Sequence, residues 1–116
     1  MQDELLLKTV RINMLFDFYE SLLTDKQQTF MRLYYHDNYS LGEIAEQFAI
    51  SRQAVYEHIK RAERMLEDYE SRLALLGKHE ARVLLIERLR EAVSELPGSQ
   101  RLILGKLCEE FSQLEG

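Results

Sequence analysis

A group of polar residues near the middle of the chain has side chains suited to nucleic-acid recognition. Positions 53, 56, 57 and 60 fall on one side of a helix, with Arg52 beside them. Gln53 suits paired hydrogen bonds to adenine, and Arg52 suits guanine or a phosphate. Tyr56 suits a phosphate or the methyl group of thymine, and Lys60 suits the DNA backbone. The predicted nucleic-acid-binding residues are Ser51, Arg52, Gln53, Tyr56, Glu57, Lys60 and Arg61.

An ordinary solvent-exposed helix face would also be polar, so the surrounding pattern has to support this prediction. Ser40 and Glu43 form a capping box that starts a helix over 41–48, and Ser51 caps the next helix. The apolar anchors are Ile44, Ala45, Phe48, Ile50, Val55 and Ile59. Their spacing predicts a helix-turn-helix. Ala49 is a departure, because the turn usually has Gly with positive φ, and Ala there is strained by about 1 kcal/mol.

Helices explain the rest of the chain as well, so the predicted fold class is all-α. The first helix is expected over about 4–23, with apolar groups around much of its surface and therefore neighbours on more than one side. Thr24 and Gln27 form another capping box, which starts a helix running to about Tyr35. Two further helices, separated at Pro97, are expected to form a C-terminal hairpin.

The second helix of the helix-turn-helix is expected to be the longest element, running from Arg52 until Gly77. Its inner residues recur in alternating steps of four and three, the repeat of a heptad seam. They are Val55, Ile59, Ala62, Leu66, Tyr69, Leu73 and Leu76. The seam beyond Leu66 needs a covering surface, supplied either by the chain's own hairpin or by a second copy. We predict a helix-turn-helix domain at 1–76, a packing or dimerisation arm at 77–116, and a homodimer.

The sequence contains no group of residues that predicts catalysis. His36, His58 and His79 lie far apart, without a carboxylate or thiol partner at ligand spacing. The five glycines form no phosphate-binding loop. Cys108 is best explained as a small apolar residue on a helix face, since it has no partner for a disulfide. We therefore expect no metal, no cofactor and no enzymatic activity.

The charge balance argues against strong nonspecific DNA binding. The chain has a net charge of -5, with 46% hydrophobic and 30% charged residues. From Thr24 to Arg64, six basic residues face six acidic ones, so the segment with the reading face is neutral. Duplex binding would need the basic residues gathered on one face and two copies of the domain. No apolar run reaches membrane-spanning length, and the N-terminus is no signal peptide, so a cytoplasmic location without membrane contact is expected.

The segment LTDKQQTFMRLYYHDNYSLGEIAEQFAISRQAVYEHIKRAERMLEDYE resembles the DNA-reading module of bacterial sigma factors, the region-four type. More narrowly, DFYESLLTDKQ, LYYHDNYSLGEIAE, ISRQAVYEHIKRAE and LEDYESRL resemble the YlxM family of small bacterial proteins. The resemblance covers residues 8 to 76, and the remaining chain matches only in being helical. It implies a cytoplasmic bacterial protein, usually encoded beside the GTPase of the signal recognition particle and thought to act in that targeting pathway.

Two functions are compatible with these observations. The first is a DNA-binding regulator of the signal recognition particle pathway that reads duplex DNA as a homodimer. The second is an interaction module that modulates the particle's GTPase, or binds its RNA, without binding DNA. The cap and core spacing favours the first, whereas the neutral reading segment and the family resemblance favour the second.

Overall fold

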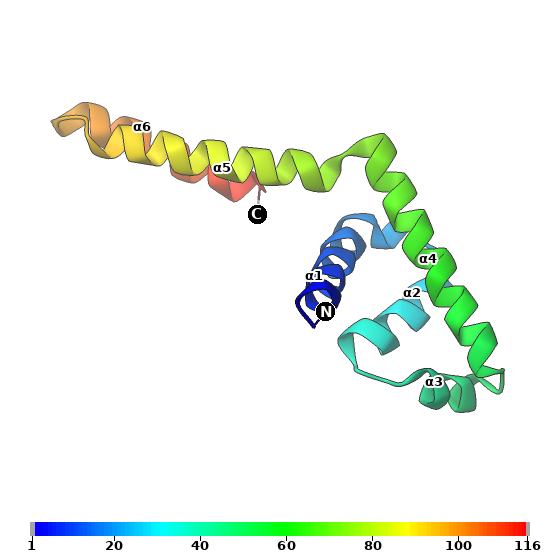
Figure 1. The fold of residues 1–116 in the computed structure, drawn as a ribbon. Coiled ribbons are helices and arrows are strands. Elements are labelled where there is room, and N and C mark those ends of the chain that lie inside the picture. The colour runs from blue at the N-terminus through cyan, green and yellow to red at the C-terminus, as the bar shows by residue number, and fades with distance from the viewer. Residues whose placement is uncertain (1, 116) are drawn as a thin grey trace. The chain divides into compact units, whose positions relative to one another are not determined.

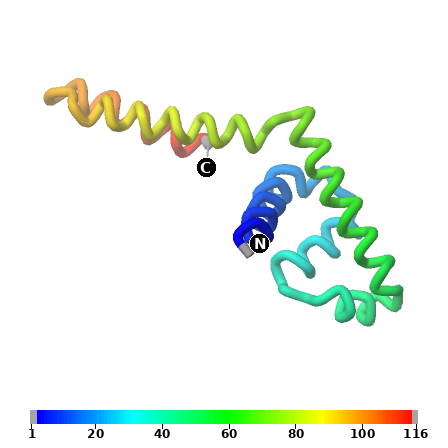
Figure 2. Tube along the Cα trace, viewed as in Figure 1, coloured from blue at the N-terminus to red at the C-terminus, as the bar shows by residue number. Residues whose placement is uncertain are grey.

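The computed structural model describes residues 2–115 as helices joined by short turns, and no strand occurs among them. The elements are α1 (Gln2–Tyr19), a 3₁₀ turn (Glu20–Leu22), α2 (Asp25–Met31), a π-helical turn (Arg32–His36), α3 (Leu41–Phe48), α4 (Arg52–Leu73), α5 (Leu75–Ser94) and α6 (Gly98–Glu115). The chain divides into two compact units between Ala74 and Leu75 (Figures 1 and 2). The predicted all-α class with a C-terminal hairpin is therefore confirmed.

The first unit is built around α4, which contacts α1, α2 and α3 (Figure 1). Its largest completely buried side chains come from all four helices. They are Leu15, Tyr19, Phe30, Met31, Ile44, Val55 and Leu66. Because these residues remove most of their apolar area from water only when the helices pack together, the hydrophobic effect holds the four helices as one body.

The predicted helix starts are present in the structure. The Thr24 hydroxyl accepts the Gln27 backbone N–H at 3.2 Å, and the Gln27 side chain accepts the Thr24 N–H at 3.0 Å. Ser40 and Glu43 form the same reciprocal pair, with both distances 3.0 Å. These caps satisfy backbone amides that have no partner inside the helix, which fixes where α2 and α3 begin.

The first helices end earlier than expected. α1 ends at Tyr19 rather than near residue 23, because a 3₁₀ turn and the extended backbone of Leu23 follow before the Thr24 cap. α2 ends as an α-helix at Met31 and continues to His36 only as a π-helical turn. The expectation that α1 has neighbours on more than one side is also wrong for its N-terminal half. Exposed there are Leu5, Leu6, Leu7 and Val10.

The long helix ends at Leu73, four residues before the predicted stop at Gly77. Ala74 adopts a left-handed conformation, with φ 54° and ψ 33°, and its N–H donates to the Glu70 carbonyl at 2.9 Å. Gly77 lies instead inside α5, so Leu76 belongs to another helix and does not extend the seam. Alanine is a strong helix former, and for that reason its sequence position gave no sign of a stop.

Most of the predicted seam is covered inside the first unit. Val55, Ile59, Ala62 and Leu66 are buried, and the Tyr69 hydroxyl donates to the Leu22 carbonyl at 3.2 Å. The covering helices are α1, α2 and α3. The seam on α4 therefore gives little reason to expect a dimer, since the chain's own helices already bury it.

The second unit is the helical hairpin of α5 and α6, which pack on each other on either side of Pro97. Ile86, Val93 and Cys108 are buried, which confirms the assignment of Cys108 as a small buried residue. Each helix nevertheless exposes apolar side chains. The most exposed are Leu84, Leu85, Leu89, Leu102, Ile103, Leu107, Phe111 and Leu114. A surface of this kind is typical of an interaction site.

The strained turn at Ala49 yields a stability prediction. Ala49 has φ 55° and ψ 44°, the left-handed conformation that the sequence indicated. We expect Ala49→Gly to raise the free energy of unfolding by up to about 1 kcal/mol, because Gly has no Cβ to clash there. Ala54→Gly, inside α4, is the control and should lower it by about 1 kcal/mol. Urea titration followed by circular dichroism measures the free energy of unfolding of both variants. If Ala49→Gly loses as much stability as Ala54→Gly, Ala49 is not strained.

Candidate nucleic-acid interface

The predicted reading face rests on a tightly anchored pair of helices. Ile44 and Ala45 of α3 are buried, as are Val55 and Ile59 of α4, so four of the predicted anchors form part of the core. The Ile50 N–H donates to the Ala45 carbonyl at 3.0 Å across the turn. These contacts fix α3 against α4 and leave the opposite side of α4 at the surface.

Two further anchors are less buried than their spacing suggested. Phe48 is 38% exposed, but its ring meets the edge of the buried Phe30 ring at 5.0 Å between centroids. Ile50 in the turn is half-buried. The ring centroid of His58 lies 5.2 Å from that of Phe30, and burial lowers the pKa of His58, with Lys26 and Arg61 adding to the effect. The histidine thus supports packing beneath the helix pair.

The N-terminal residues of α4 have defined partners in the free protein. The Ser51 hydroxyl accepts the Ala54 N–H at 3.0 Å, so it acts as the helix cap. The Arg52 side chain lies over α3, and a Cβ added at Gly42 would stand 3.0 Å from its Nε atom. The Gln53 amide donates to the Glu57 carboxylate at 3.1 Å. Glu57 therefore orients a candidate base-reading side chain instead of facing a phosphate itself.

The later residues of the predicted face do not all point the same way. Tyr56 is 44% exposed, and the Lys60 ammonium lies 5.5 Å from the centre of its ring. Lys60 also pairs with Glu63 at 3.3 Å, which turns it along α4 toward α1. Arg61 is exposed on the neighbouring side of the helix. The face is thus open at Arg52, Gln53 and Tyr56, while Lys60 joins a second cluster.

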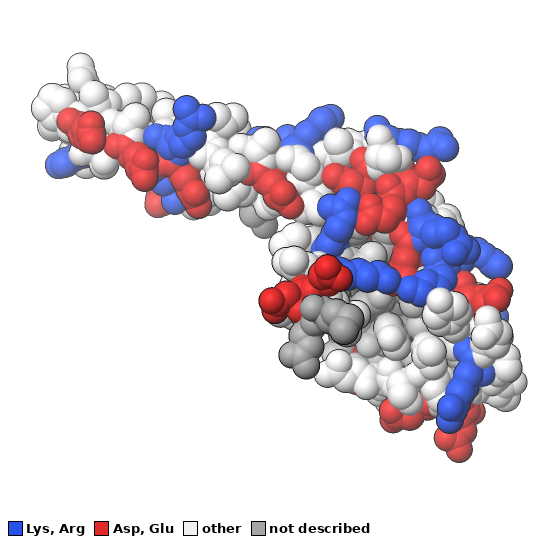
Figure 3. All heavy atoms as spheres, viewed as in Figure 1, with Lys and Arg blue, Asp and Glu red and all other residues white. Residues whose placement is uncertain are grey.

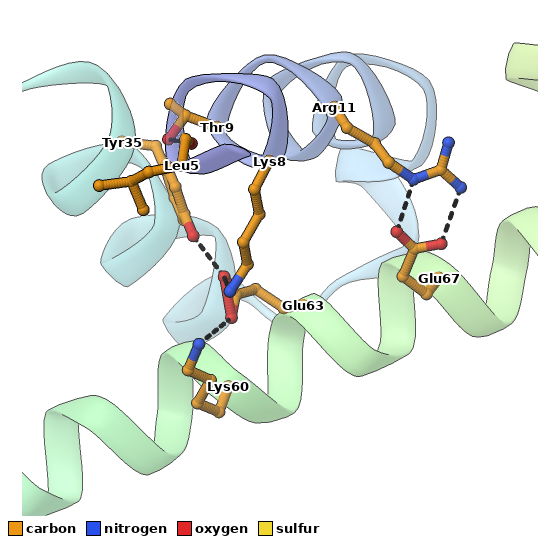
Figure 4. Close-up of polar contacts among 8 residues, drawn as sticks. All are labelled: Leu5, Lys8, Thr9, Arg11, Tyr35, Lys60, Glu63 and Glu67. Carbon is orange, nitrogen blue, oxygen red and sulfur yellow. Dashed lines mark hydrogen bonds and ion pairs between the residues drawn. The ribbon is translucent and has the colours of Figure 1, made fainter. Parts of the chain in front are cut away.

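This second cluster surrounds Glu63 and was not predicted from the sequence (Figure 4). Glu63 as a whole is 6% exposed, and its carboxylate accepts a hydrogen bond from the Tyr35 hydroxyl and pairs with Lys8 at 3.8 Å and Lys60 at 3.3 Å. Burial, followed by the hydrogen bond to Glu63, raises the pKa of Tyr35, so the phenol keeps its proton. A sequence signal did exist, because Glu63 follows Ile59 by four residues and therefore lies on the inner side of α4.

A second polar contact joins α1 to α4 beside this cluster. Arg11 donates to both oxygens of Glu67, from Nε at 2.7 Å and from the second guanidinium nitrogen at 2.8 Å (Figure 4). The guanidinium lowers the pKa of the Glu67 carboxyl by this paired hydrogen bonding. Farther along, the Tyr19 hydroxyl donates to Glu70 at 2.6 Å. These pairs fix the register of α1 along α4, and with it the position of Lys8.

Both signs of charge are present around α4. On the face drawn in Figure 3, acidic side chains gather toward the C-terminal end of α4 and a band of basic side chains lies beside them, while the segment from Thr24 to Arg64 is neutral by count. Within residues 2–115, no group of three His, Cys, Asp or Glu side chains is placed to hold a metal ion. In the same range, no helix is both long and apolar enough to cross a membrane.

Comparisons with known proteins agree with this architecture. Residues 6–103 match the model of the family UPF0122, described as "Putative helix-turn-helix protein, YlxM / p13 like". A UPF0122 protein of Halalkalibacterium halodurans is 55% identical over 108 residues, which cover 93% of this chain and 97% of that protein. Its counterpart in Geobacillus kaustophilus is 53% identical over 108 residues, with the same coverage. A Bacillus cereus relative is 59% identical over 88 residues, covering 76% of this chain and 80% of that protein.

Proposed function

The chain belongs to the UPF0122 family of YlxM/p13-like helix-turn-helix proteins, and from this premise we propose that it is a regulatory protein that binds duplex DNA through α4. The observation that carries the proposal is the anchored α3–α4 pair. Its core residues are buried, whereas Arg52, Gln53 and Tyr56 remain exposed on the opposite side of α4. This is the arrangement in which a helix enters the major groove.

Each exposed residue has a role that its geometry supports. Arg52 lies at the first turn of α4, so a small rotation away from Gly42 brings its guanidinium to a phosphate or a guanine. Gln53 would exchange its hydrogen bond with Glu57 for paired bonds to adenine. The proposed nucleic-acid-binding set remains Ser51, Arg52, Gln53, Tyr56, Glu57, Lys60 and Arg61. Two of these act indirectly, because Ser51 caps the start of α4 and Glu57 orients Gln53.

We further propose that the protein binds DNA as a homodimer joined through the α5–α6 hairpin. A single reading segment is electrically neutral and would bind phosphates weakly, whereas two linked copies bind two half-sites together. The hairpin carries six basic and seven acidic residues, so two copies repel each other little. Two helices cannot bury both of their apolar faces alone, but two hairpins can form a four-helix bundle.

A gel-shift series across salt concentrations tests DNA binding. If each reading face contacts about three to five phosphates, each bound copy should add about −3 to −4 to the slope of log affinity against log salt, so the dimer should show a slope of about −6 to −8. The double variant Arg52→Ala with Lys60→Ala should weaken binding about 10-fold or more and flatten this slope by about two units for each bound copy. Arg72→Ala with Arg101→Ala removes the same charge elsewhere and is the control. Failure to bind at low salt, or equal losses in both variants, would contradict the proposal.

A second candidate function is favoured by the exposed apolar residues of the hairpin and by the neutral reading segment. In this alternative, the protein modulates the GTPase of the signal recognition particle, or binds its RNA, without binding DNA. Co-elution of the purified protein with the particle, together with altered GTP turnover, is the expected result. The two functions are distinguished by Arg52→Ala, which should weaken DNA binding and leave the GTP turnover of the particle unchanged.

A further inference from the structure

A groove of about 440 Å³ lies between the N-terminal half of α1, the π-helical turn with the loop after it, and α4. Its size falls in the range typical of small-ligand sites. All of its lining belongs to the first unit, and the residues that matter most are Lys8, Tyr34, Tyr39, Tyr56, Lys60 and Glu63. DNA reading by the N-terminal turn of α4 does not explain this groove. Two of the three walls of the groove, α1 and the π-helical turn with its loop, lie outside α3 and α4.

The first property of the groove is its aromatic lining. Tyr34 and Tyr39 are each 36% exposed, and Tyr56 is 44% exposed, although all three line a concave surface. The ring of Tyr34 stands edge-on to that of Tyr35, with 5.0 Å between centroids, so the pair is held in place. Exposed tyrosine faces around a hollow are suited to stacking against a flat ring.

The second property is an excess of positive charge. The Lys8 and Lys60 ammonium groups share one carboxylate, that of Glu63, and the Tyr35 hydroxyl donates to the same group (Figure 4). Two cations therefore face one anion at the floor of the groove. Side-chain hydrogen bonding between the two lysines lowers the pKa of Lys8 and raises that of Lys60, so the two ammonium groups stand close enough to repel each other when both are charged. An additional anion would relieve this repulsion.

The third property is that the cationic lining continues along α4. A neighbouring groove of about 370 Å³ shares Lys8, Lys60 and Glu63 with the first, and adds Arg64 together with the paired Arg11 and Glu67, which leaves an excess of basic side chains. The two lysines thus form a boundary between an aromatic hollow on one side and a more basic hollow on the other. A ligand that carries a flat ring and an anionic group would reach both.

We propose that this groove binds one nucleotide unit, with its base against Tyr34, Tyr39 and Tyr56 and its phosphate on Lys8 and Lys60. The same chemistry is offered by a free mononucleotide and by an unpaired nucleotide of a single strand. Glu63 and Tyr35 hold the two lysines in position and do not need to touch the ligand. The proposal does not rest on duplex binding, because Lys8, Tyr34 and Tyr39 lie outside the helix-turn-helix.

The test is an NMR titration of the full-length protein at low salt with four probes. The probes are adenosine 5′-monophosphate, an eight-nucleotide adenosine strand, an eight-base-pair duplex and inorganic phosphate. Backbone signals of Lys8, Asn38 and Tyr39 should shift with the nucleotide and with the single strand. Shifts with the free nucleotide at comparable affinity identify a mononucleotide site, whereas shifts with the strand alone identify an unpaired nucleotide. Either result supports the proposal.

Two variants decide whether the groove is responsible. Tyr39→Leu should weaken binding about 5-fold or more, the loss typical of one base–aromatic stack. Lys8→Gln should weaken it and reduce its salt dependence. Lys106→Gln, in α6, makes the same charge change and should have little effect. The proposal is overturned if no probe binds, if phosphate alone shifts the signals as strongly as the nucleotide, or if both groove variants bind like the wild type.

Discussion

Phe30→Ala is expected to lower the free energy of unfolding of the first unit by about 3–5 kcal/mol. Phe30 is completely buried, and its ring packs against Phe48 of α3 and His58 of α4. The distances between ring centroids are 5.0 Å and 5.2 Å. Removal of the ring therefore leaves a cavity directly beneath the helix pair that carries the proposed reading face. Because small domains are stabilised by only about 5–15 kcal/mol, this loss would unfold a substantial fraction of the protein.

The measurement is urea unfolding followed by far-ultraviolet circular dichroism, since the chain has no tryptophan to report by fluorescence. Leu7→Ala is the control, because Leu7 of α1 in the same unit is 68% exposed and its side chain fills no buried site. Phe48→Ala should be intermediate, since that ring is 38% exposed. A Phe30 variant as stable as the Leu7 variant would mean that the packing beneath the helix pair is not as described.

Features encoded by residues close together in the sequence were predicted accurately. The pairs Thr24–Gln27 and Ser40–Glu43 are reciprocal caps in the structure, and Ser51 starts α4, because each cap depends on residues only three positions apart. The positive φ of Ala49 was also indicated, since the spacing of the neighbouring anchors demands that turn.

Features that depend on distant residues were missed. The stop of α4 at Ala74 has no local sign, because alanine favours continuation of the helix and Gly77 offered a more obvious end. The groove was missed for a different reason. Lys8, Tyr35 and Glu63 are separated by more than 20 residues from each other, and only the packing of α1 and the π-helical turn on α4 brings them together.

The proposed assembly yields the second large effect, the loss of the dimer in Leu107→Glu. Leu107 lies on α6 with Ile103, Phe111 and Leu114 at helical spacing, and all four side chains are exposed in the single chain. In a four-helix bundle of two hairpins, this stripe would be buried. A glutamate there would place an unpaired charge in an apolar interface, which weakens association by about 100-fold or more.

Sedimentation at tens of micromolar should show the wild type at twice the 13.7 kDa mass of one chain, and Leu107→Glu at that mass itself. The variant should keep its helical content, because Leu107 is 53% exposed in the single chain. Gln100→Glu adds the same charge at an exposed position of α6 and should remain dimeric. A monomeric wild type, or a dimeric Leu107 variant, would refute assembly through the hairpin.

The same variant connects assembly to DNA binding. Because one reading segment is electrically neutral, the proposed affinity depends on two linked copies that engage two half-sites. Leu107→Glu should therefore weaken duplex binding although every residue of the reading face is intact, and its salt slope should fall to about half of the wild-type value. If the monomeric variant binds the duplex as tightly as the wild type, one copy is sufficient, and the hairpin's apolar surface serves a different partner.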